Sequence, residues 1–295
     1  MTGEAVVRLL APGDEPHVEA LLAQHPDSSL FLRRNLAAGG VVDREARYHG
    51  SWVGAFERDR LVAVAQHTRF GTVLVQAPAH VGAIAALAAL ASGRAVSGVV
   101  GPWTQVRAAR AARGFDGLPM RVESHEGLYA LSLDALVVPE TLTSGRWRCR
   151  RASRDDLDVL VDWRVAYNVE ANHEPDDPQV RAWSCEEIET GLAERTGFVL
   201  EADGDPVAYQ QFNAALPDVV QVGGVWTPPA LRSRGYARAV VAGSLLVARA
   251  EGVPRSVLFT GEDNVPAQRA YAALGFRRVG DWGLLFLATP TRLEA

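Results

Sequence analysis

The stretch that decides the fold runs from Val219 to Phe276 and reads VVQVGGVWTPPALRSRGYARAVVAGSLLVARAEGVPRSVLFTGEDNVPAQRAYAALGF. It opens with an apolar, β-branched run through Trp226, which is typical of a buried strand. Pro228 and Pro229 end that strand because neither residue can donate a ladder hydrogen bond. A glycine-containing turn then leads directly into a long helical pattern of apolar residues. The stretch therefore predicts a strand, a tight turn and a helix in immediate succession.

The turn between the strand and the helix reads Arg232-Ser233-Arg234-Gly235-Tyr236-Ala237. The first turn of a helix leaves backbone N–H groups without partners, and the helix dipole adds partial positive charge there. Small residues such as Gly235 and Ala237 let an anion approach the backbone closely, and a pyrophosphate fits this arrangement. The side chains of Arg232, Arg234 and Arg238 add positive charge. Alone, the short glycine motif is also compatible with an ordinary turn that carries solvated arginines.

A second strand and a second helix follow. The segment 256–260 is typical of a strand, and Asn264 is a good N-cap for a helix with Pro266 in its first turn. Tyr271 lies seven residues after Asn264, two helical turns on, so both side chains can face one side. Gly275 is expected to end the helix as a left-handed cap.

Taken together, these motifs resemble the GNAT superfamily of acyl-CoA-dependent N-acyltransferases. The R-x-x-G-x-A turn runs from Arg232 to Ala237, and the N-x-x-A-x-x-x-Y helix runs from Asn264 to Tyr271 and is followed by Leu-Gly-Phe. The Gly-Gly-Val-Trp-Thr-Pro-Pro run and the Gly-Tyr-Ala turn are most similar to the FR47-like subgroup. The resemblance implies an α+β fold of three layers, with a mixed, mostly antiparallel twisted sheet flanked by helices.

Composition limits the class of protein. The chain has 295 residues, of which 48% are apolar, enough for two packed domains. Its net charge of −5 gives no footprint of nucleic-acid binding. It shows no long uncharged apolar run and no signal-peptide pattern, so we expect a cytoplasmic protein with no membrane partner. All 30 basic residues are arginine, which excludes a lysine Schiff base and a Walker lysine. The isolated Cys149 and Cys185 and the scattered histidines predict neither a disulfide framework nor a metal site.

The first half shows the same order of elements as the second, although no residue-level repeat is visible. We predict strands at 6–10, 52–57, 61–67, 72–76, 95–100 and 123–133, and helices at 16–24, 29–37, 80–91 and 105–113. We therefore predict two tandem GNAT-like domains, residues 1–140 and 141–295, joined by a linker within 135–145. After Val75 the first half reads Gln-Ala-Pro-Ala-His and lacks the R-x-x-G-x-A turn. We expect this degenerate domain to bind no acyl-CoA and to wall the substrate cleft of the second domain.

The segment between residues 147 and 227 completes the predicted second domain. Strands are expected at 147–151, 198–202, 207–212 and 219–227. Ser153 should cap a helix that ends near Val169, and a Ser184–Glu187 capping box should open the next helix after a loop at 171–182. Seven acids and one arginine lie in the region 170–189, namely Glu170, Glu174, Asp176, Asp177, Arg181, Glu186, Glu187 and Glu189. In this fold the region borders the acceptor site, where a negative rim would attract a cationic amine; a solvated face is the other interpretation.

The resemblance also implies a mechanism, in which an amine attacks the thioester carbonyl of acetyl-CoA, or of another acyl-CoA, and the thiolate leaves. The implied cofactor-binding residues are Val225, Trp226 and Thr227 for the pantetheine, Ser233, Arg234, Gly235, Tyr236, Ala237 and Arg238 for the pyrophosphate, and Arg232 and Asn264. A backbone N–H at the end of the Val225 strand would stabilise the oxyanion. Tyr271 matches the family's catalytic tyrosine, which would protonate the thiolate. Periodicity alone makes Tyr271 a core residue and Asn264 an N-cap.

The general base and the acceptor are left open by the sequence. Glu174, Glu201 and Glu262 are candidate bases, but none stands at a distinctive place, and a chain of water molecules can serve instead. The expected acceptor is a small-molecule or peptide amine, and the expected state is a monomer or a homodimer. Two alternatives are a mycothiol-synthase-like tandem acetyltransferase and a non-catalytic acyl-CoA-binding or regulatory module, which would bind without turnover. A purely structural protein would bind no CoA.

Overall fold

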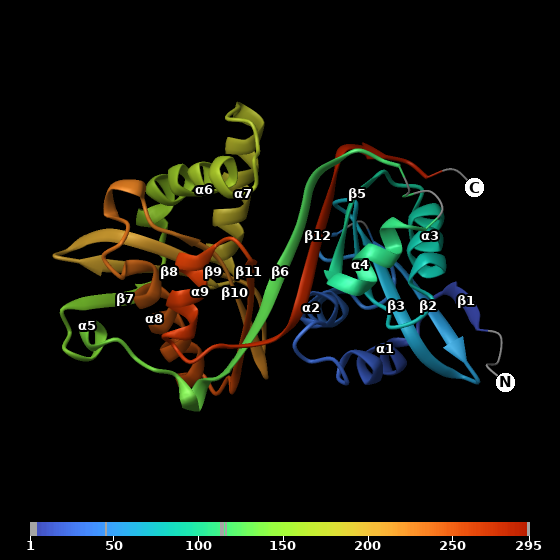
Figure 1. The fold of residues 1–295 in the computed structure, drawn as a ribbon, viewed down its shortest axis with the longest axis horizontal. Coiled ribbons are helices and arrows are strands. Elements are labelled where there is room, and N and C mark those ends of the chain that lie inside the picture. The colour runs from blue at the N-terminus through green and yellow to red at the C-terminus, as the bar shows by residue number, and fades with distance from the viewer. Residues whose placement is uncertain (1–4, 45, 113–114, 116, 294–295) are drawn as a thin grey trace. The chain divides into compact units, whose positions relative to one another are not determined.

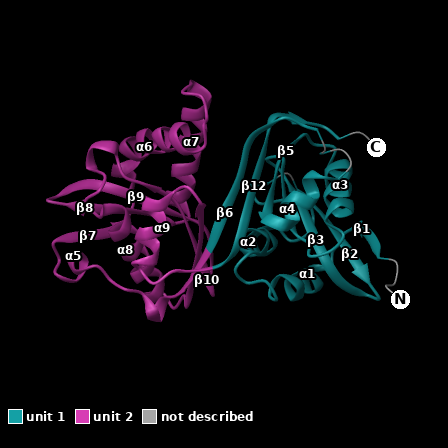
Figure 2. Ribbon diagram, viewed as in Figure 1, with its two compact units in different colours: residues 1–128, 279–295 teal, residues 129–278 magenta. Residues whose placement is uncertain are grey.

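The structure, a computed structural model, describes residues 5–293 except 45, 113–114 and 116. The chain divides into two compact units, which Figure 2 shows in different colours. Unit 1 contains residues 1–128 and 279–295, and unit 2 contains residues 129–278. The chain therefore leaves unit 1 once, completes unit 2, and returns to unit 1 for its last strand.

Unit 1 is a sheet with helices packed against it (Figure 1). Its elements are β1 (Val6–Leu9), α1 (Glu15–Leu22), α2 (Leu30–Gly39), β2 (Gly50–Glu57), β3 (Arg60–Thr68), β4 (Thr72–Gln76), α3 (Val81–Ser92), β5 (Val96–Pro102), α4 (Trp103–Arg110), the first part of β6 (Met120–Ser132) and most of β12 (Arg277–Thr291). The strand order is β1-β2-β3-β4-β5-β12-β6. The alanine-rich face of α3, with Ile84, Ala85 and Ala88, packs on the valines of β2–β5. The predicted end of the fourth helix at residue 113 lies outside the described residues.

Unit 2 has three layers, with helices on both faces of its sheet (Figure 1). Its elements are the end of β6, α5 (Glu140–Thr143), β7 (Trp147–Arg151), α6 (Leu157–Ala171), α7 (Pro178–Ala193), β8 (Gly197–Ala202), β9 (Asp205–Leu216), β10 (Val219–Trp226), α8 (Tyr236–Ala250), β11 (Arg255–Gly261) and α9 (Val265–Ala272). The strand order is β6-β11-β10-β9-β8-β7. Alternate residues of a strand point to opposite faces. Phe198 and Phe212 accordingly pack with α8, whereas Val199 and Tyr209 pack with α6 and α7.

The two halves repeat one order of elements, as the sequence predicts: a strand, two helices, three strands, a helix, a strand, a helix and a last strand. The last strands differ from a simple tandem arrangement. The neighbour of β5 is β12, paired antiparallel from Trp282–Pro102 to Phe286–Gly98, and the neighbour of β11 is β6. The first nine elements of each half therefore pack together, but the tenth element, the last strand, is exchanged. Strand β12 from the second half lies beside β5, and β6 from the first half lies beside β11.

The division by contacts differs from the sequence-based boundary near residue 140. Unit 2 already begins at Tyr129, and the segment predicted as a linker belongs to it. Leu136 from this segment, and Leu133 just before it, are buried in the same core as α8. At the other end, Val279 and the residues after it belong to unit 1. Local sequence patterns do not reveal this division, because the residues of β12 indicate a strand but do not indicate which strand it pairs with.

A residue-level repeat marks the start of both halves, although the sequence analysis found none. Arg8 on β1 donates two hydrogen bonds to Asp14 before α1, at 2.7 and 2.8 Å. Arg150 on β7 likewise donates two to Asp156 before α6, also at 2.7 and 2.8 Å. Each aspartate also accepts a backbone N–H from three residues earlier, at 2.8 Å. The expectation was wrong because an arginine and an aspartate six residues apart form no recognisable pattern until the turn folds.

Helix α7 begins six residues before the predicted Ser184 start, at Pro178. The carboxylate of Asp177 accepts the N–H groups of Gln179 and Val180, both at 2.9 Å, so Asp177 is the N-cap and Pro178 occupies the first position. Ser184 is buried within the helix and bonds to Asn168 instead. The predicted Ser153 cap is confirmed, with a capping box closed by Asp156. Among the described residues, no helix combines the length and the apolar character that crossing a membrane requires.

Candidate active site

Strand β10 carries a bulge near its end. Its register with β9 is interrupted between Gly223 and Trp226, so Gly224 and Val225 have no Cα partner on β9. Gly224 has a φ of +56°, in the left-handed region that glycine adopts readily. The bulge turns this part of β10 out of the regular ladder and changes where its peptide groups point.

The parallel pairing of β10 with β11 is short. Val220 pairs with Ser256 and Gln221 with Val257, and among the described residues the register continues no further. The two strands run on for several residues toward their carboxyl ends, so they separate from Val222 onward. An edge of β10 that includes the bulge is therefore open on its β11 side, where another extended group could add as a strand does.

The N-terminus of α8 lies directly after this edge along the chain. Gly235, with φ of +87°, is its N-cap, and no side chain caps the helix. Ser233 also has a left-handed φ, of +62°. The first described residue of this turn whose N–H finds a backbone acceptor is Ala239, which donates to the Gly235 carbonyl at 3.0 Å. No described residue accepts the N–H groups of residues 233–238, so these six donors are available to an anion.

The three arginines of the turn have different surroundings. Arg232 donates to the Thr227 carbonyl at 3.1 Å and to Glu170 at 2.8 Å, and its guanidinium lies over the Trp226 ring. It therefore closes the turn that Pro228 and Pro229 begin. The exposed Arg234 and Arg238 remain beside Gly235, where Arg234 makes one contact of 3.3 Å to the Ala230 carbonyl.

Helix α9 carries the other two predicted site residues. Asn264 is the N-cap and accepts the Ala267 N–H at 3.2 Å, and its side chain is exposed. Tyr271 is half-buried and packs on the unit 2 core, with its ring edge to face against Phe276 at 6.0 Å between centroids. Both roles that periodicity alone assigns to these residues are thus present in the structure.

A polar layer between α6, α7 and the sheet was not predicted from the sequence. Arg164 on α6 pairs with Glu187 on α7 through two hydrogen bonds, one of 2.7 Å from Nε. The Tyr209 hydroxyl donates to Gln211 at 2.8 Å, and burial raises the pKa of this phenol. A signal existed, because Arg164 continues the i, i+3, i+4, i+7 spacing of the apolar face of α6. A charged residue on an apolar stripe marks a buried pair or a site.

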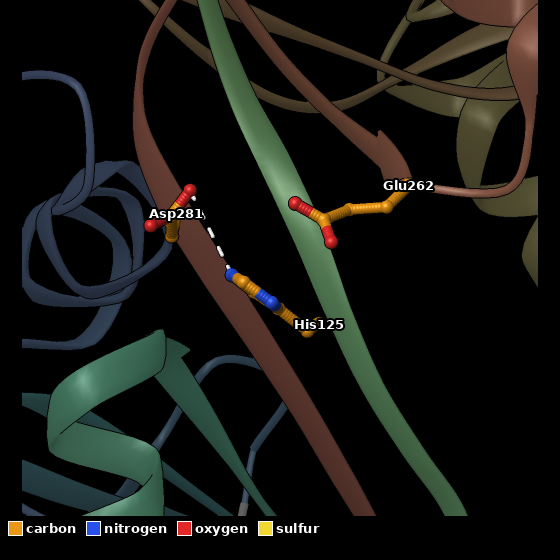
Figure 3. Close-up of side chains that lie close together, drawn as sticks. All are labelled: His125, Glu262 and Asp281. Atoms are coloured by element: carbon orange, nitrogen blue, oxygen red, sulfur yellow. Dashed lines mark ion pairs between the residues drawn. The ribbon is translucent and has the colours of Figure 1, made fainter.

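The acidic rim predicted between residues 170 and 189 is partly neutralised. Glu170 pairs with Arg232 at 2.8 Å, Glu187 with Arg164, and Glu189 with Arg154 at 3.0 Å. Two of the candidate bases also contact arginine: Glu201 with Arg150 at 2.6 Å, and Glu262 with Arg278 at 2.7 Å. In unit 1, His125 on β6 and Asp281 on β12 form an ion pair of 3.7 Å, which Figure 3 marks with a dashed line.

The end of β4 in unit 1, which is equivalent to the end of β10 in unit 2, is occupied by residues of unit 1 itself. The residue after β4, Ala77, donates its N–H to the Gln105 side chain at 2.6 Å. Pairing of β4 with β5 extends over three residue pairs, from Thr72–Gly98 to Leu74–Val100. The two strands stay close after these pairs, because a Cβ on Gly101 would lie 2.6 Å from the carbonyl oxygen of Val75. The glycine turn is absent, and α3 follows His80.

A family comparison supports this interpretation of unit 2. Residues 157–276 match the model of the acetyltransferase (GNAT) family, and they include the bulge, the turn, α8 and α9. This part of the chain is similar to the GNAT acetyltransferases, and the similarity supports acetyl transfer as a general activity.

Similar proteins agree with a tandem GNAT fold. Mycothiol acetyltransferase from Thermomonospora curvata is 27% identical over 173 residues, which are 57% of this chain and 55% of that protein. The chain thus spans about half the length of the curated relative it matches. A GCN5-related N-acetyltransferase from Sphaerobacter thermophilus has 18% identity and a TM-score of 0.58 over 95% of this chain and 94% of that one. A tandem GNAT protein from the clavulanic acid biosynthesis pathway has 16% identity and a TM-score of 0.54 over 98% and 100%. These structures share the fold, which confirms the predicted architecture.

Two observations test whether an acyl-CoA fits unit 2. The hydroxyl of Thr227, at the end of the open edge, is buried and has no hydrogen-bond partner among the described residues. The six N–H groups of residues 233–238 also await an acceptor. An extended amide-containing arm next to a pyrophosphate would satisfy both, so the residues present fit this ligand.

Proposed function

We propose that unit 2 transfers an acetyl group from acetyl-CoA, or an acyl group from another acyl-CoA, to a primary amine of a small molecule or peptide. The observation that carries the proposal is the open edge of β10 followed at once by the uncapped N-terminus of α8. An edge for an extended arm and a cluster of N–H groups for a pyrophosphate stand next to each other along the chain. Few ligands besides an acyl-CoA combine these two parts.

The donor would be held by the residues that form these two features. The backbone of Val225, Trp226 and Thr227 would bind the pantetheine by strand addition. The N–H groups of residues 233–238 would bind the pyrophosphate, with added charge from Arg234 and Arg238. Arg232 would act indirectly by closing the turn, and Asn264 would add a contact from α9.

The reaction would be a direct transfer. The amine nitrogen bonds to the carbonyl carbon, the carbon–sulfur bond breaks, and the sulfur takes a proton. A backbone N–H at the bulge would stabilise the negative charge that develops on the carbonyl oxygen. The Tyr271 hydroxyl would supply the proton to the sulfur. The amine's own proton would leave through water, since two of the three candidate carboxylates are already paired with arginine.

The acceptor is proposed to be a cationic amine, because the region 170–189 contains seven acids and one arginine. Ethylenediamine and ethanolamine differ chiefly in a second ammonium group and make a matched pair of probes. At low salt, thiol release from acetyl-CoA should show a higher kcat/KM for ethylenediamine. A preference for ethanolamine would remove the cationic class. Binding of acetyl-CoA without thiol release from a wider set of amines would instead favour the non-catalytic module.

Tyr271→Phe tests the proton donor. The variant removes one hydroxyl and keeps the ring against Phe276, so folding should be unchanged. We expect kcat to fall by about a hundredfold, in the range of lost general acid catalysis, with acetyl-CoA affinity retained. Unchanged kcat would exclude Tyr271 from the chemistry.

A second candidate rests on a separate observation, the 27% identity to a mycothiol acetyltransferase. In this case the acceptor would be the one that the relative uses. Comparing turnover of that relative's acceptor with turnover of ethylenediamine, in the same assay, distinguishes the two candidates.

A further inference from the structure

Arg164 is an arginine in the interior of unit 2. It lies on α6, and its side chain is only 10% exposed. Burying a guanidinium is costly unless it is paired and hydrogen-bonded. Its nearest charged partner is Glu187 on α7, which accepts hydrogen bonds from Nε and from Nη2.

This pairing holds the guanidinium charged and fixed in direction. Burial lowers the pKa of Arg164, but the charge and hydrogen bond of Glu187 together with the nearby Tyr167 and Tyr209 outweigh burial and leave the pKa above its usual value. The guanidinium also lies over the ring of Tyr167, 4.8 Å from its centroid. A two-point pair with a carboxylate on one side and an aromatic ring over the plane leaves little freedom of rotation.

The remaining nitrogen, Nη1, points at the bulge of β10. It lies 2.6 Å from the place that a Cβ on Gly224 would occupy. No described residue accepts a hydrogen bond from Nη1. Gly224 is the residue whose left-handed φ turns β10 out of the ladder at its open edge. A charged donor in the interior is therefore directed at the point where the strand offers its backbone.

We propose that Arg164 is a catalytic residue that donates a hydrogen bond from Nη1 to the acyl carbonyl oxygen at the Gly224 bulge, which rests on the function proposed above. As the amine nitrogen bonds to the carbonyl carbon, negative charge grows on this oxygen. The electron pair then re-forms the carbonyl double bond when the carbon–sulfur bond breaks. A fixed guanidinium in a water-poor site stabilises that charge without reorganising. The proton on Nη1 is shared and not transferred.

A purely structural role makes different predictions. If Arg164 only supports the bulge, its loss should disturb the strand and weaken acetyl-CoA and free CoA equally, because both use the same β10 backbone. If it contacts the acyl oxygen, its loss should leave free CoA unaffected. A buried ion pair is weak ground for a stability role, since its desolvation cost offsets its attraction.

The experiment uses the full chain with Arg164→Gln, and with Arg164→Gln/Glu187→Gln in case the single change leaves Glu187 without a partner and impairs folding. Calorimetric titration of free CoA and acetyl-CoA, and the infrared carbonyl band of bound, carbonyl-labelled acetyl-CoA, are the readouts. Thiol release with ethylenediamine adds a kinetic readout. Circular dichroism melting confirms which variant is folded.

We expect both variants to bind free CoA as the unmodified protein does, and the carbonyl band to move to higher frequency because a charged donor is lost. We expect kcat to fall about a hundredfold, as for the loss of one oxyanion donor. An unchanged carbonyl band overturns the proposal, as does an equal loss of affinity for free CoA and acetyl-CoA. If the unmodified protein binds no acetyl-CoA, the function proposed above fails, and this outcome is distinct from the others.

Discussion

Unit 1 and unit 2 repeat the same elements in the same order, but they treat the end of their fourth strand differently. After β4 the Ala77 N–H is taken by Gln105 at 2.6 Å, and the chain enters α3 without a glycine turn. After β10 the Thr227 hydroxyl has no partner among the described residues, and Gly235 opens α8. In unit 1 the Gln105 side chain thus occupies a backbone donor at the end of β4 while the order of elements is kept. Function resides in the site and not in the fold.

The largest effect should come from a negative charge in the turn of unit 2. Gly235→Asp places a carboxylate where the pyrophosphate would bind. It also strains the left-handed φ of +87°, so circular dichroism melting must first show that the variant is folded. Repulsion of about 3 kcal/mol at intermediate dielectric corresponds to about a hundredfold weaker acetyl-CoA binding. The matched change in unit 1 is Ala79→Asp, before α3, which should leave acetyl-CoA affinity unchanged. Titration calorimetry checks both, and equal losses from the two variants would break the comparison.

The next effect concerns the bulge, which unit 2 has and β4 lacks. Gly224→Ala forces a side chain into the left-handed region and within 2.6 Å of Arg164 Nη1. Strain and overpacking together should lower the free energy of unfolding by about 2–4 kcal/mol. Gly93→Ala in unit 1 has a similar left-handed φ of +63° but open space, so it isolates the strain. Denaturant unfolding of the two variants should differ; equal costs would show that Arg164 does not crowd the bulge.

A third effect compares the arginine–aspartate pairs at the two starts. Hydrogen bonds from Arg150 lower the pKa of Asp156, and those from Arg8 hold the pKa of Asp14 at about 2. A carboxylate whose pKa is lowered in the folded state stabilises the protein at pH values above its unfolded pKa of about 4. This contribution is lost as the pH falls through the folded pKa. Asp156→Asn should cost about 2 kcal/mol at neutral pH and flatten the loss of stability below about pH 4.

The matched variant for this third effect is Asp14→Asn. It should show the same flattening with a smaller cost, because Arg8 is more exposed than Arg150. Urea midpoints measured across this pH range decide the matter. A steeper pH dependence in either variant would contradict the assigned direction of the pKa shifts.

The smallest effect is expected from Gln105→Ala in unit 1. Its removal leaves the Ala77 N–H without its acceptor and should cost about 1 kcal/mol of stability. It should not create a second acyl-CoA site, because the turn before α3 still lacks Gly235's counterpart. A rise in acetyl-CoA stoichiometry to two in this variant would show that Gln105 alone closes unit 1.

Much of the fold could be predicted because its signals are local. The strand, turn and helix around Gly235 and the capped helix from Asn264 depend on residues within one or two turns of each other. The start of α7 was missed because Asp177 and Ser184 are both good caps, and the choice was made by burial of Ser184 against Asn168. The same limit applies to the exchange of β6 and β12, whose pairing depends on strands more than a hundred residues away.

The residues of the candidate site also fall into two groups: those that a local motif indicates and those that depend on distant contacts. The residues that form its backbone donors follow from the sequence motif, and their role in binding remains a prediction. Arg164 and Gln105 were not proposed, because each acts on a partner far along the chain: Gly224 for Arg164, and Ala77 for Gln105. Glu187 was named only for a capping box and for the acidic rim. Arg232 shows the reverse case, since a residue counted as part of the anion turn holds Thr227 and Glu170 instead.

The central claim is that unit 2 offers an acyl-CoA site and that unit 1 has closed its own. The most direct test is a calorimetric titration of acetyl-CoA into the full chain. We expect one site per chain, and we expect Gly235→Asp to weaken binding at this site about a hundredfold. Two sites per chain, or no binding by the folded protein, would contradict it.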